Sequence, residues 1–341
     1  MKKKVLAAMM TGVMLLGLTA CGSKEQASAE TPQTDAADET EAPAETEAPA
    51  ETEGNASSGE TIKIGVLMKT MSDTYSNKLG EAIQKYAADT YSEVELYLMD
   101  GQADIAKQIS QAEDLIAKQV DVIILNPQDA DGSAQVLDLA ADADIPVIEV
   151  NTETTRTDYV SFIGSDDRQA GEIMGNFVME QLGAEGGQYA ILEGEMGQSA
   201  QLLRYEGLEN TILANEAFDC AATLSANWSR DEAMATTEDW LGKYADLKAI
   251  ICENDDMSMG ALQAAESQNR ELVIIGTDAI PDALQAVKDG RLSGTVLQDA
   301  NTQASTSVDV AVKIAKGETV EERYDVPFQL ITIDNVDDFM E

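Results

Sequence analysis

Polar and aromatic side chains follow the apolar segments of this 341-residue chain with unusual regularity. The side chains at these positions include carboxylates, amides, a guanidinium and two large aromatic rings. They belong to Lys69, Asp73, Tyr75, Asn126, Asn151, Thr152, Glu193, Glu195, Arg204, Trp228, Glu253, Asn254, Asp255, Asp278 and Gln298. Carboxylates, amides and guanidinium groups offer acceptors and forked donors that match adjacent hydroxyl groups. The rings of Tyr75 and Trp228 are suited to cover the apolar faces of a small sugar-like ring.

Each of these polar side chains also has a simpler role available. Asp73 precedes a predicted helix and Asp278 stands shortly before Pro281, so either residue suits a helix N-cap. Helix capping can explain each of these residues singly, but it does not explain why so many polar residues follow strands. In open α/β sheets, ligands sit beyond the carboxyl ends of the strands. A whole set of polar residues at strand ends therefore favours a binding site.

Short apolar runs alternate with longer amphipathic stretches from Thr61 onward. The predicted strands are 62–68, 93–99, 121–126, 146–150, 159–163, 189–192, 221–224, 248–252 and 272–275. The predicted helices are 74–90, 104–118, 135–143, 168–182, 199–213, 231–241 and 257–266. This alternation predicts an α/β fold with doubly wound parallel sheets. The length of this body exceeds what one core usually serves, so we expect two lobes.

The first residues have the order of a bacterial export signal. Three lysines precede an apolar run from Val5 to Leu18, which is too short to span a membrane comfortably. The tetrad ending at Cys21 resembles the lipobox of bacterial lipoproteins. We therefore expect a signal peptide at 1–20, a lipidated Cys21 and an extracytoplasmic, membrane-anchored protein; an unlipidated secreted protein is the alternative. Residues 21–60 are expected to be a disordered acidic tether, because they lack large apolar side chains.

Charge and residue usage narrow the function classes. The formal net charge is −41, which disfavours nucleic acid and anionic lipid surfaces as partners. The chain has no histidine, so histidine-based triads and HExxH metallopeptidases are excluded. No Walker loop, GxSxG elbow or GxGxxG turn occurs. Cys220 and Cys252 are expected to be free thiols, although their pairing cannot be judged from sequence.

Five stretches carry a resemblance to a known family. They are residues 121–127, 145–148, 254–262, 275–278 and 294–301. In this order they resemble the ribose- and glucose/galactose-binding branch of the type I periplasmic-binding-protein family, across nearly all of residues 61–341. The resemblance implies two lobes joined by three crossovers near Ile163, Asn301 and Pro327. The implied N-terminal lobe is 61–163 with 301–326, and the implied C-terminal lobe is 164–300 with 327–341.

The same resemblance selects eight of the strand-end residues as the binding site and implies a role for each of them. The polar members would hydrogen-bond the hydroxyls of a monosaccharide, while Tyr75 and Trp228 would sandwich its ring. The polar members are Asp73, Asn151, Arg204, Asn254, Asp278 and Gln298. Closure of the lobes would then present the loaded protein, a monomer without a cofactor, to an ABC permease.

At three positions the sequence differs from the sugar-binding relatives that it resembles, so the resemblance does not identify the sugar. Gln198 and Ala200 stand where the glucose/galactose branch has a His and an Asp, and Thr152 stands where ribose-type relatives have an Arg. A short turn at 183–188 replaces the calcium loop of the glucose/galactose branch, so no metal is expected.

Two other functions are compatible with the sequence. A receptor of this fold, binding a sugar-like autoinducer or polyol, would feed a sensor or chemotaxis system instead of a permease. A glycan-active enzyme would need paired carboxylates, for which Glu193 and Glu195 are the candidates.

Overall fold

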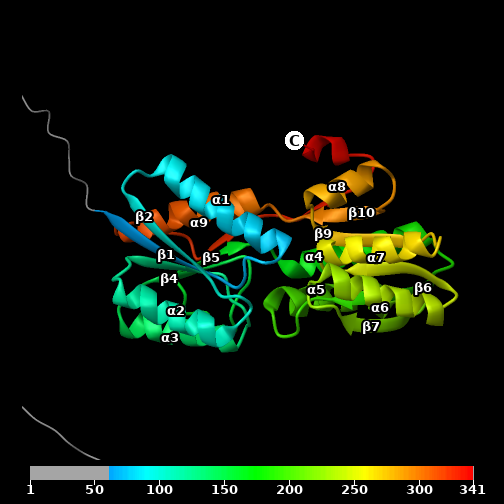
Figure 1. The fold of residues 1–341 in the computed structure, drawn as a ribbon, viewed down its shortest axis with the longest axis horizontal. Helices are drawn as coiled ribbons and strands as arrows, with labels where there is room; N and C mark the ends of the chain where they lie inside the picture. Colours follow the sequence, from blue (N-terminus) through cyan, green and yellow to red (C-terminus); the bar gives the residue numbers. More distant parts are fainter. Residues whose placement is uncertain (1–60, 341) are drawn as a thin grey trace, which may run out of the picture. The chain divides into compact units, whose positions relative to one another are not determined.

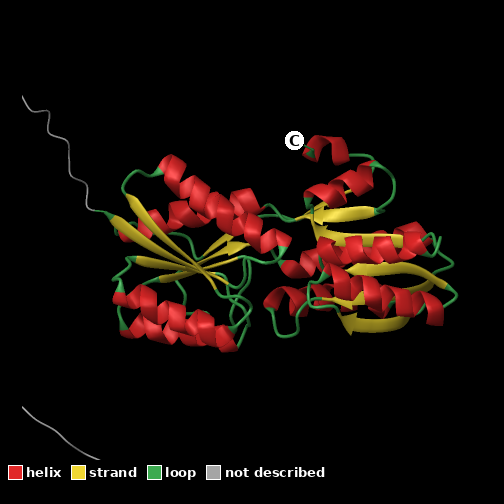
Figure 2. Cartoon of the chain, viewed as in Figure 1, coloured by secondary structure: helices red, strands yellow, loops and turns green. Residues whose placement is uncertain are grey.

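The computed structural model describes residues 61–340, which form two α/β lobes (Figure 1). The predicted signal peptide, Cys21 and the acidic tether lie outside these residues. The strands within residues 61–340 make two six-stranded sheets, one in each lobe (Figure 2). We call the lobe that begins the chain the first lobe and the other the second lobe.

The sheet of the first lobe has the strand order β11-β5-β4-β3-β1-β2, and every pair is parallel. Its strands are β1 (Ile62–Met68), β2 (Val94–Asp100), β3 (Val122–Leu125), β4 (Val147–Val150), β5 (Ser161–Gly164) and β11 (Arg323–Asp325). Helices α1 (Thr74–Thr90) and α9 (Ala300–Ala315) cover one face, and α2 (Ile105–Ala117) and α3 (Gln135–Asp142) cover the other. Strands β1, β3 and β4 are almost wholly buried, as continuous apolar runs in a doubly covered sheet should be.

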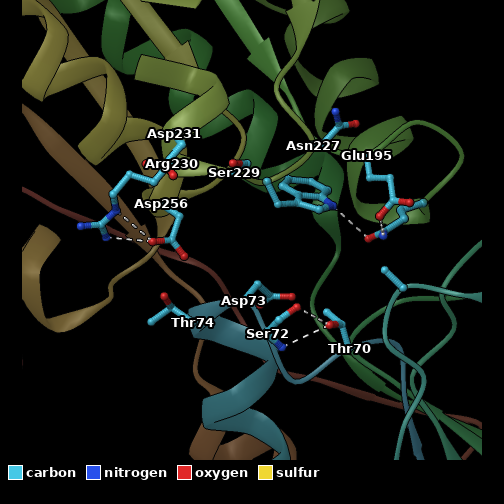
Figure 3. Close-up of a pocket in the computed structure, with 13 residues that line it drawn as sticks. Thr70, Ser72, Asp73, Thr74, Glu195, Asn227, Ser229, Arg230, Asp231 and Asp256 are labelled. Atoms are coloured by element: carbon cyan, nitrogen blue, oxygen red, sulfur yellow. Dashed lines mark hydrogen bonds and ion pairs between the residues drawn. The ribbon is translucent and has the colours of Figure 1, made fainter. Parts of the chain in front are cut away.

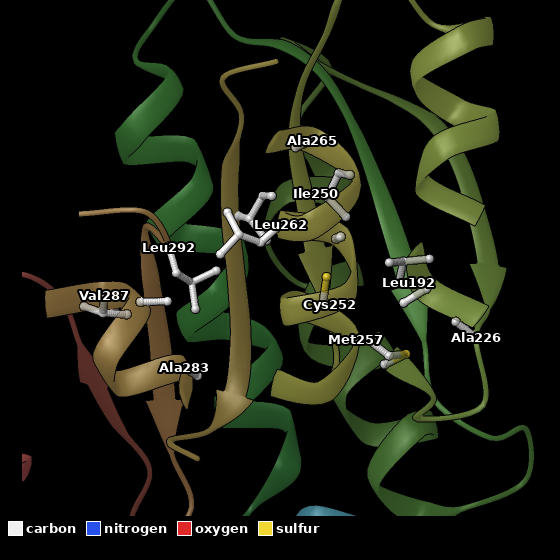
Figure 4. Close-up of a cluster of buried hydrophobic side chains, with 14 of the residues drawn as sticks. Leu192, Ala226, Ile250, Cys252, Met257, Leu262, Ala265, Ala283, Val287 and Leu292 are labelled. Atoms are coloured by element: carbon white, nitrogen blue, oxygen red, sulfur yellow. The ribbon is translucent and has the colours of Figure 1, made fainter. Parts of the chain in front are cut away.

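The sheet of the second lobe has the order β12-β10-β9-β8-β6-β7. Its strands are β6 (Gly187–Glu193), β7 (Phe218–Ser225), β8 (Leu247–Cys252), β9 (Val273–Asp278), β10 (Gly294–Leu297) and β12 (Gln329–Ile331). Helices α6 (Arg230–Lys243), α7 (Asp255–Ser267) and α8 (Pro281–Lys288) pack on one face, and α4 (Asp167–Leu182) and α5 (Ser199–Glu209) on the other. Leu192, Ile250 and Cys252 contribute to the core under the first of these faces (Figure 4).

The predicted fold class is confirmed, with two refinements. Strand β12 pairs antiparallel with β10 at the sheet edge, so the second sheet is parallel only in its other pairs. The helix expected at 199–213 ends earlier, at Glu209. Thr211 leaves the helical conformation, and its hydroxyl donates to the Gly207 carbonyl at 2.9 Å.

The chain passes between the two sheets three times. These passages lie between β5 and β6, between β10 and α9, and between β11 and β12. Helix α9 packs against α1 and so belongs with the first sheet. The lobe boundaries inferred from the sequence, 61–163 with 301–326 and 164–300 with 327–341, are kept as a proposal. No helix among residues 61–340 is long and apolar enough to cross a membrane.

Candidate functional site

All eight predicted site residues line one cavity between the two lobes. The cavity is lined by Lys69, Asp73, Tyr75, Ser76, Asn151, Ala200, Arg204, Trp228, Asn254, Asp278 and Gln298. Its volume is about 20 Å³, which is roughly the space of one water molecule. An outer crevice of about 360 Å³ shares Asp73 and Trp228 with this cavity (Figure 3). A ring-shaped ligand therefore reaches the cavity only when the lobes part or the side chains move.

The first lobe contributes Asp73 and Tyr75 from the beginning of α1. Asp73 caps this helix, because its Oδ1 accepts from the Ser76 amide at 2.6 Å. The capping prediction and the cavity prediction therefore both apply to Asp73. The Tyr75 hydroxyl donates to Gln303 Oε1 at 3.1 Å, which fixes the ring against α9.

Asn151 follows β4 and has a left-handed backbone with φ of 68°, which asparagine tolerates better than most residues. The neighbouring Thr152 is tied to β3 because its hydroxyl lies 2.8 Å from Asn126 Nδ2 and donates to the Pro127 carbonyl. The two neighbours therefore have different roles: Asn151 lines the cavity, and Thr152 fixes the loop to the segment that follows β3.

Arg204 is the most heavily bonded side chain of the cavity wall. Its Nε donates to Asp167 Oδ1 at 2.8 Å and its guanidinium also donates to Gln298 Oε1 at 3.2 Å and to the Glu253 carbonyl. Burial lowers the pKa of Arg204, but the carboxylates of Asp167 and Asp278 raise it more, so the guanidinium stays charged. Arg204 thus orients Gln298 as well as facing the cavity itself.

The Trp228 ring lies directly against the backbone of Gly194. A Cβ atom at Gly194 would collide with the ring, so only glycine leaves room for it there. Trp228 also has a left-handed backbone with φ of 60°, and its indole donates to Gln198 Oε1 at 3.1 Å. The ring is therefore held in place from both its face and its edge.

Asn254 and Asp278 complete the wall from the second lobe. Asn254 caps α7 by accepting from the Met257 amide at 2.9 Å. The expectation that Asp278 caps the next helix is wrong: α8 begins at Pro281, and Ile280 holds the N-cap position. Asp278 instead has φ of 127°, and no hydrogen-bond donor within residues 61–340 reaches its carboxylate. Burial raises the pKa of Asp278 well above its ordinary value.

Lys69 is absent from the eight predicted residues, although it directly follows β1. It is only 7% exposed, and its ammonium donates to Gln198 Oε1 at 2.9 Å. This bond joins the first lobe to the second. Lys69 belongs to the polar residues that the sequence places at strand ends, but the family resemblance assigns it no role in binding.

The other candidates from the sequence lie outside the cavity wall. Glu193 accepts from Gln201, and Glu195 accepts from Gln128 and Gln198 and lines only the outer crevice. They do not face each other across the cavity as a hydrolytic pair would. Cys220 and Cys252 are both free thiols. No group of three or more metal-ligating side chains gathers among the residues that the structure describes.

The fold and the cavity define a class: a two-lobed α/β protein with a polar, buried cavity between its lobes. Residues 64–319 match the family described as Periplasmic binding protein domain, and the chain belongs to that family. The resemblance inferred from the five sequence stretches is thereby confirmed.

Three relatives show how similar the chain is to proteins of this family. A putative rhizopine-binding protein of Rhizobium meliloti is 33% identical over 293 residues, covering 83% of this chain and 94% of the relative. The ribose import binding protein of Salmonella typhimurium is 31% identical over 278 residues, covering 81% and 92%. The structure of an ABC transporter solute binding protein from Bacillus halodurans C-125 with bound myo-inositol has a TM-score of 0.79 and 34% identity, covering 82% and 97%.

Proposed function

We propose that this chain captures a neutral polyhydroxylated ring, either a monosaccharide or a cyclic polyol, and delivers it to an ABC importer. The observation that carries this proposal is a set of unmet donors and unmet acceptors in one buried cavity. A hydroxyl group both donates and accepts, so a ring bearing several hydroxyls satisfies both kinds of group. A ligand with acceptors alone would leave the carboxylates unpaired.

The unmet donors come from Lys69 and Gln298. An ammonium has three N–H donors, and the Lys69 ammonium has one protein acceptor in the side chain of Gln198. Gln298 Nε2 is buried without a partner, whereas the amide oxygen of the same side chain accepts from Arg204. A buried donor without a partner costs about 1–3 kcal/mol, which a bound hydroxyl oxygen would recover.

The unmet acceptors are carboxyl oxygens of Asp73 and Asp278. Asp73 uses one oxygen on the cap of α1 and keeps the other free, and Asp278 accepts from no donor within residues 61–340. Tyr75 and Trp228 supply the aromatic surfaces that would cover the apolar C–H faces of the ring. The relatives that carry ribose or myo-inositol in their names or structures support a ligand of this class.

Capture is expected to proceed by closure of the lobes around the ligand. The export signal and Cys21 support an extracytoplasmic protein anchored by lipid, acting as a monomer with a permease as its partner. Catalysis is not part of the proposal, because family relatives are named as solute-binding proteins and Glu193 and Glu195 lie outside the cavity. In this role the exported protein hands its ligand to an importer. A sensor of the same fold would instead have a kinase or a chemoreceptor as its partner.

A ligand screen tests the proposal directly. The purified protein would be melted with D-ribose, D-allose, D-galactose, D-glucose, xylitol or myo-inositol, since a ligand that binds only the folded state raises the melting temperature. We expect at least one of the five cyclic compounds to raise it by several degrees, whereas a shift with open-chain xylitol alone would contradict a ring-shaped ligand. No shift with any of the six would overturn the proposed ligand class.

Calorimetry with the compound that binds would then test the site. Trp228→Ala and Asp278→Ala should each abolish tight binding, while the matched variant Asp289→Ala, at an exposed residue after α8, should bind as the wild type does. Unchanged affinity in both site variants would contradict the assignment of the cavity.

A further inference from the structure

Residues 151–155 form a loop that joins the binding cavity to the contact between the lobes. We call this segment the Asn151 loop. Asn151 lines the cavity at one end of it. Two residues further on, the Glu153 amide donates to Ser199 Oγ of the second lobe at 2.8 Å. The position of this loop therefore affects both the ligand contacts and the closure contact.

A single buried carboxyl lies behind the loop. Glu149 is in β4 and is 0% exposed. Its Oε2 accepts from the Thr154 amide at 3.0 Å, and its Oε1 accepts from the Thr154 hydroxyl at 2.7 Å. Both oxygens of Glu149 are thus used on one residue of the Asn151 loop.

No positive charge compensates this carboxyl. The titratable groups that face it are the carboxylates of Glu153 and Asp158 and the phenol of Tyr159. The arginines that bond the neighbouring carboxylates do not bond Glu149: Arg156 bonds Asp138 and Asp158, and Arg323 bonds Glu153 and Asp325. Glu149 is therefore a buried acid held only by the two donors of Thr154.

Packing does not require an acid at this position. The other residues of β4 are Val147, Ile148 and Val150, and an apolar residue in place of Glu149 would fill the same strand without the cost of burying a carboxyl. What the acid adds is two directed hydrogen bonds to the loop.

We propose that Glu149 is a positioning residue for the binding site. It holds the Asn151 loop through Thr154, so that Asn151 faces the cavity and Glu153 meets Ser199 when the lobes close. This role rests on the proposed function, because it concerns the same cavity.

Ionisation of Glu149 changes the hold on the loop. The carboxylate accepts from both Thr154 donors, whereas the protonated acid turns one of its oxygens into a donor. Burial raises the pKa of Glu149 to about 7, so the change falls between pH 6 and pH 8. The loop is held more loosely at the acid end of this range.

The first experiment needs no ligand. Amide hydrogen exchange of residues 151–155 would be measured in the wild type, in Thr154→Val and in Thr155→Val. The control removes a neighbouring hydroxyl of the same loop, which bonds exposed Asp131 at 2.9 Å. Exchange in Thr154→Val should rise about tenfold, the effect of losing one buried hydrogen bond, with little change in melting temperature. Equal exchange in the two variants would overturn the proposal.

The second experiment measures affinity for whichever of the six screened compounds gives the largest thermal shift. Thr154→Val should bind it about tenfold more weakly and Thr155→Val within about twofold of the wild type. Wild-type affinity should fall from pH 8 to pH 6, and Glu149→Gln should show a shallower profile than the wild type. The same pH profile in both proteins would contradict the role of Glu149. If no compound binds, the proposed function fails, and the exchange experiment still decides the role of the loop.

Discussion

A buried carboxyl of each lobe, Glu149 in the first and Asp255 in the second, lies behind a segment that lines the cavity, but the two are bonded differently. Glu149 in the first lobe bonds a single loop residue, Thr154. Asp255 in the second lobe accepts from the Thr295 hydroxyl of β10 at 2.8 Å and from the Ile280 amide at 3.1 Å. Asp255 thereby joins two segments of its lobe, next to the positive-φ backbone of Asp278. Two carboxyls with similar burial therefore have different roles. Glu149 is a local brace, which holds one loop, and Asp255 is a structural hub, which holds two segments together.

The largest expected effect breaks the hub. Asp255→Ala leaves the Ile280 amide and the Thr295 hydroxyl without their acceptor in a fully buried place, so the folded state should lose about 3 kcal/mol or more. Binding should be lost as well, because the backbone of Asp278 is no longer held. Urea unfolding and calorimetry measure the two effects. A stable Asp255→Ala protein that binds normally would remove the distinction between hub and brace.

A pH series sharpens the same comparison. Burial raises the pKa of both Glu149 and Asp255 to about 7, so the folded state keeps their protons to higher pH than the unfolded state does. Stability should therefore fall as the pH rises from about 4 to 7 and then level off, by at most about 4 kcal/mol for each group.

Urea unfolding at several pH values isolates these contributions. Glu149→Gln and Asp255→Asn should each flatten the fall relative to the wild type. Exposed acids whose pKa is lowered by a salt bridge, such as Glu266 beside Arg291, give the opposite slope and serve as the control. An unchanged slope in both variants would mean that neither carboxyl holds its proton near neutral pH.

Adding a methyl group at Gly194, beside the Trp228 ring, is expected to reduce the affinity for the ligand with little loss of stability. Gly194→Ala pushes the Trp228 ring away from its seat, so affinity should fall by about tenfold or more. Gly242→Ala is a matched control in the same lobe, because its added Cβ meets nothing within 4 Å. Near-ultraviolet circular dichroism of the indole, alongside calorimetry, reports whether the ring has moved.

The smallest expected effect concerns the bond between the lobes. Lys69→Met keeps most of the side chain's length but removes the donor to Gln198 and the unmet donors of the ammonium. We expect affinity to fall by roughly threefold to tenfold, with little change in stability, because the buried ammonium costs about as much as its bond contributes. An increase in affinity would show that Lys69 competes with the ligand for the cavity.

The sequence predicted which residues lie at the strand ends. It did not predict the contacts and backbone angles that fix these residues in the cavity wall. Continuous apolar runs followed by polar residues placed the candidates at one edge of the sheet, because parallel strands bring their carboxyl ends together there. The family resemblance then selected the eight of them that line the cavity. Lys69 follows the same rule, yet the family resemblance assigns it no role in binding. Whether Asp278 caps a helix or faces a cavity depends on a backbone angle that sequence patterns do not determine.

The sequence also could not predict contacts between segments that are far apart in the chain. Glu149 reads as part of an apolar strand, and its bonds to Thr154 depend on how the following loop folds back. The Gly194–Trp228 contact joins residues from two strand ends and depends on the left-handed backbone of Trp228. Helix ends shifted by a few residues where a side-chain hydroxyl competed for backbone carbonyls, as at Thr211.

The hydrogen bonds across the cleft have a kinetic consequence. Lys69 with Gln198 and Glu153 with Ser199 join the lobes around a cavity with room for about one water molecule. A ligand must then wait for the lobes to separate before it enters. In a stopped-flow experiment the observed association rate should level off as ligand concentration rises, and the plateau would equal the frequency with which the empty protein opens.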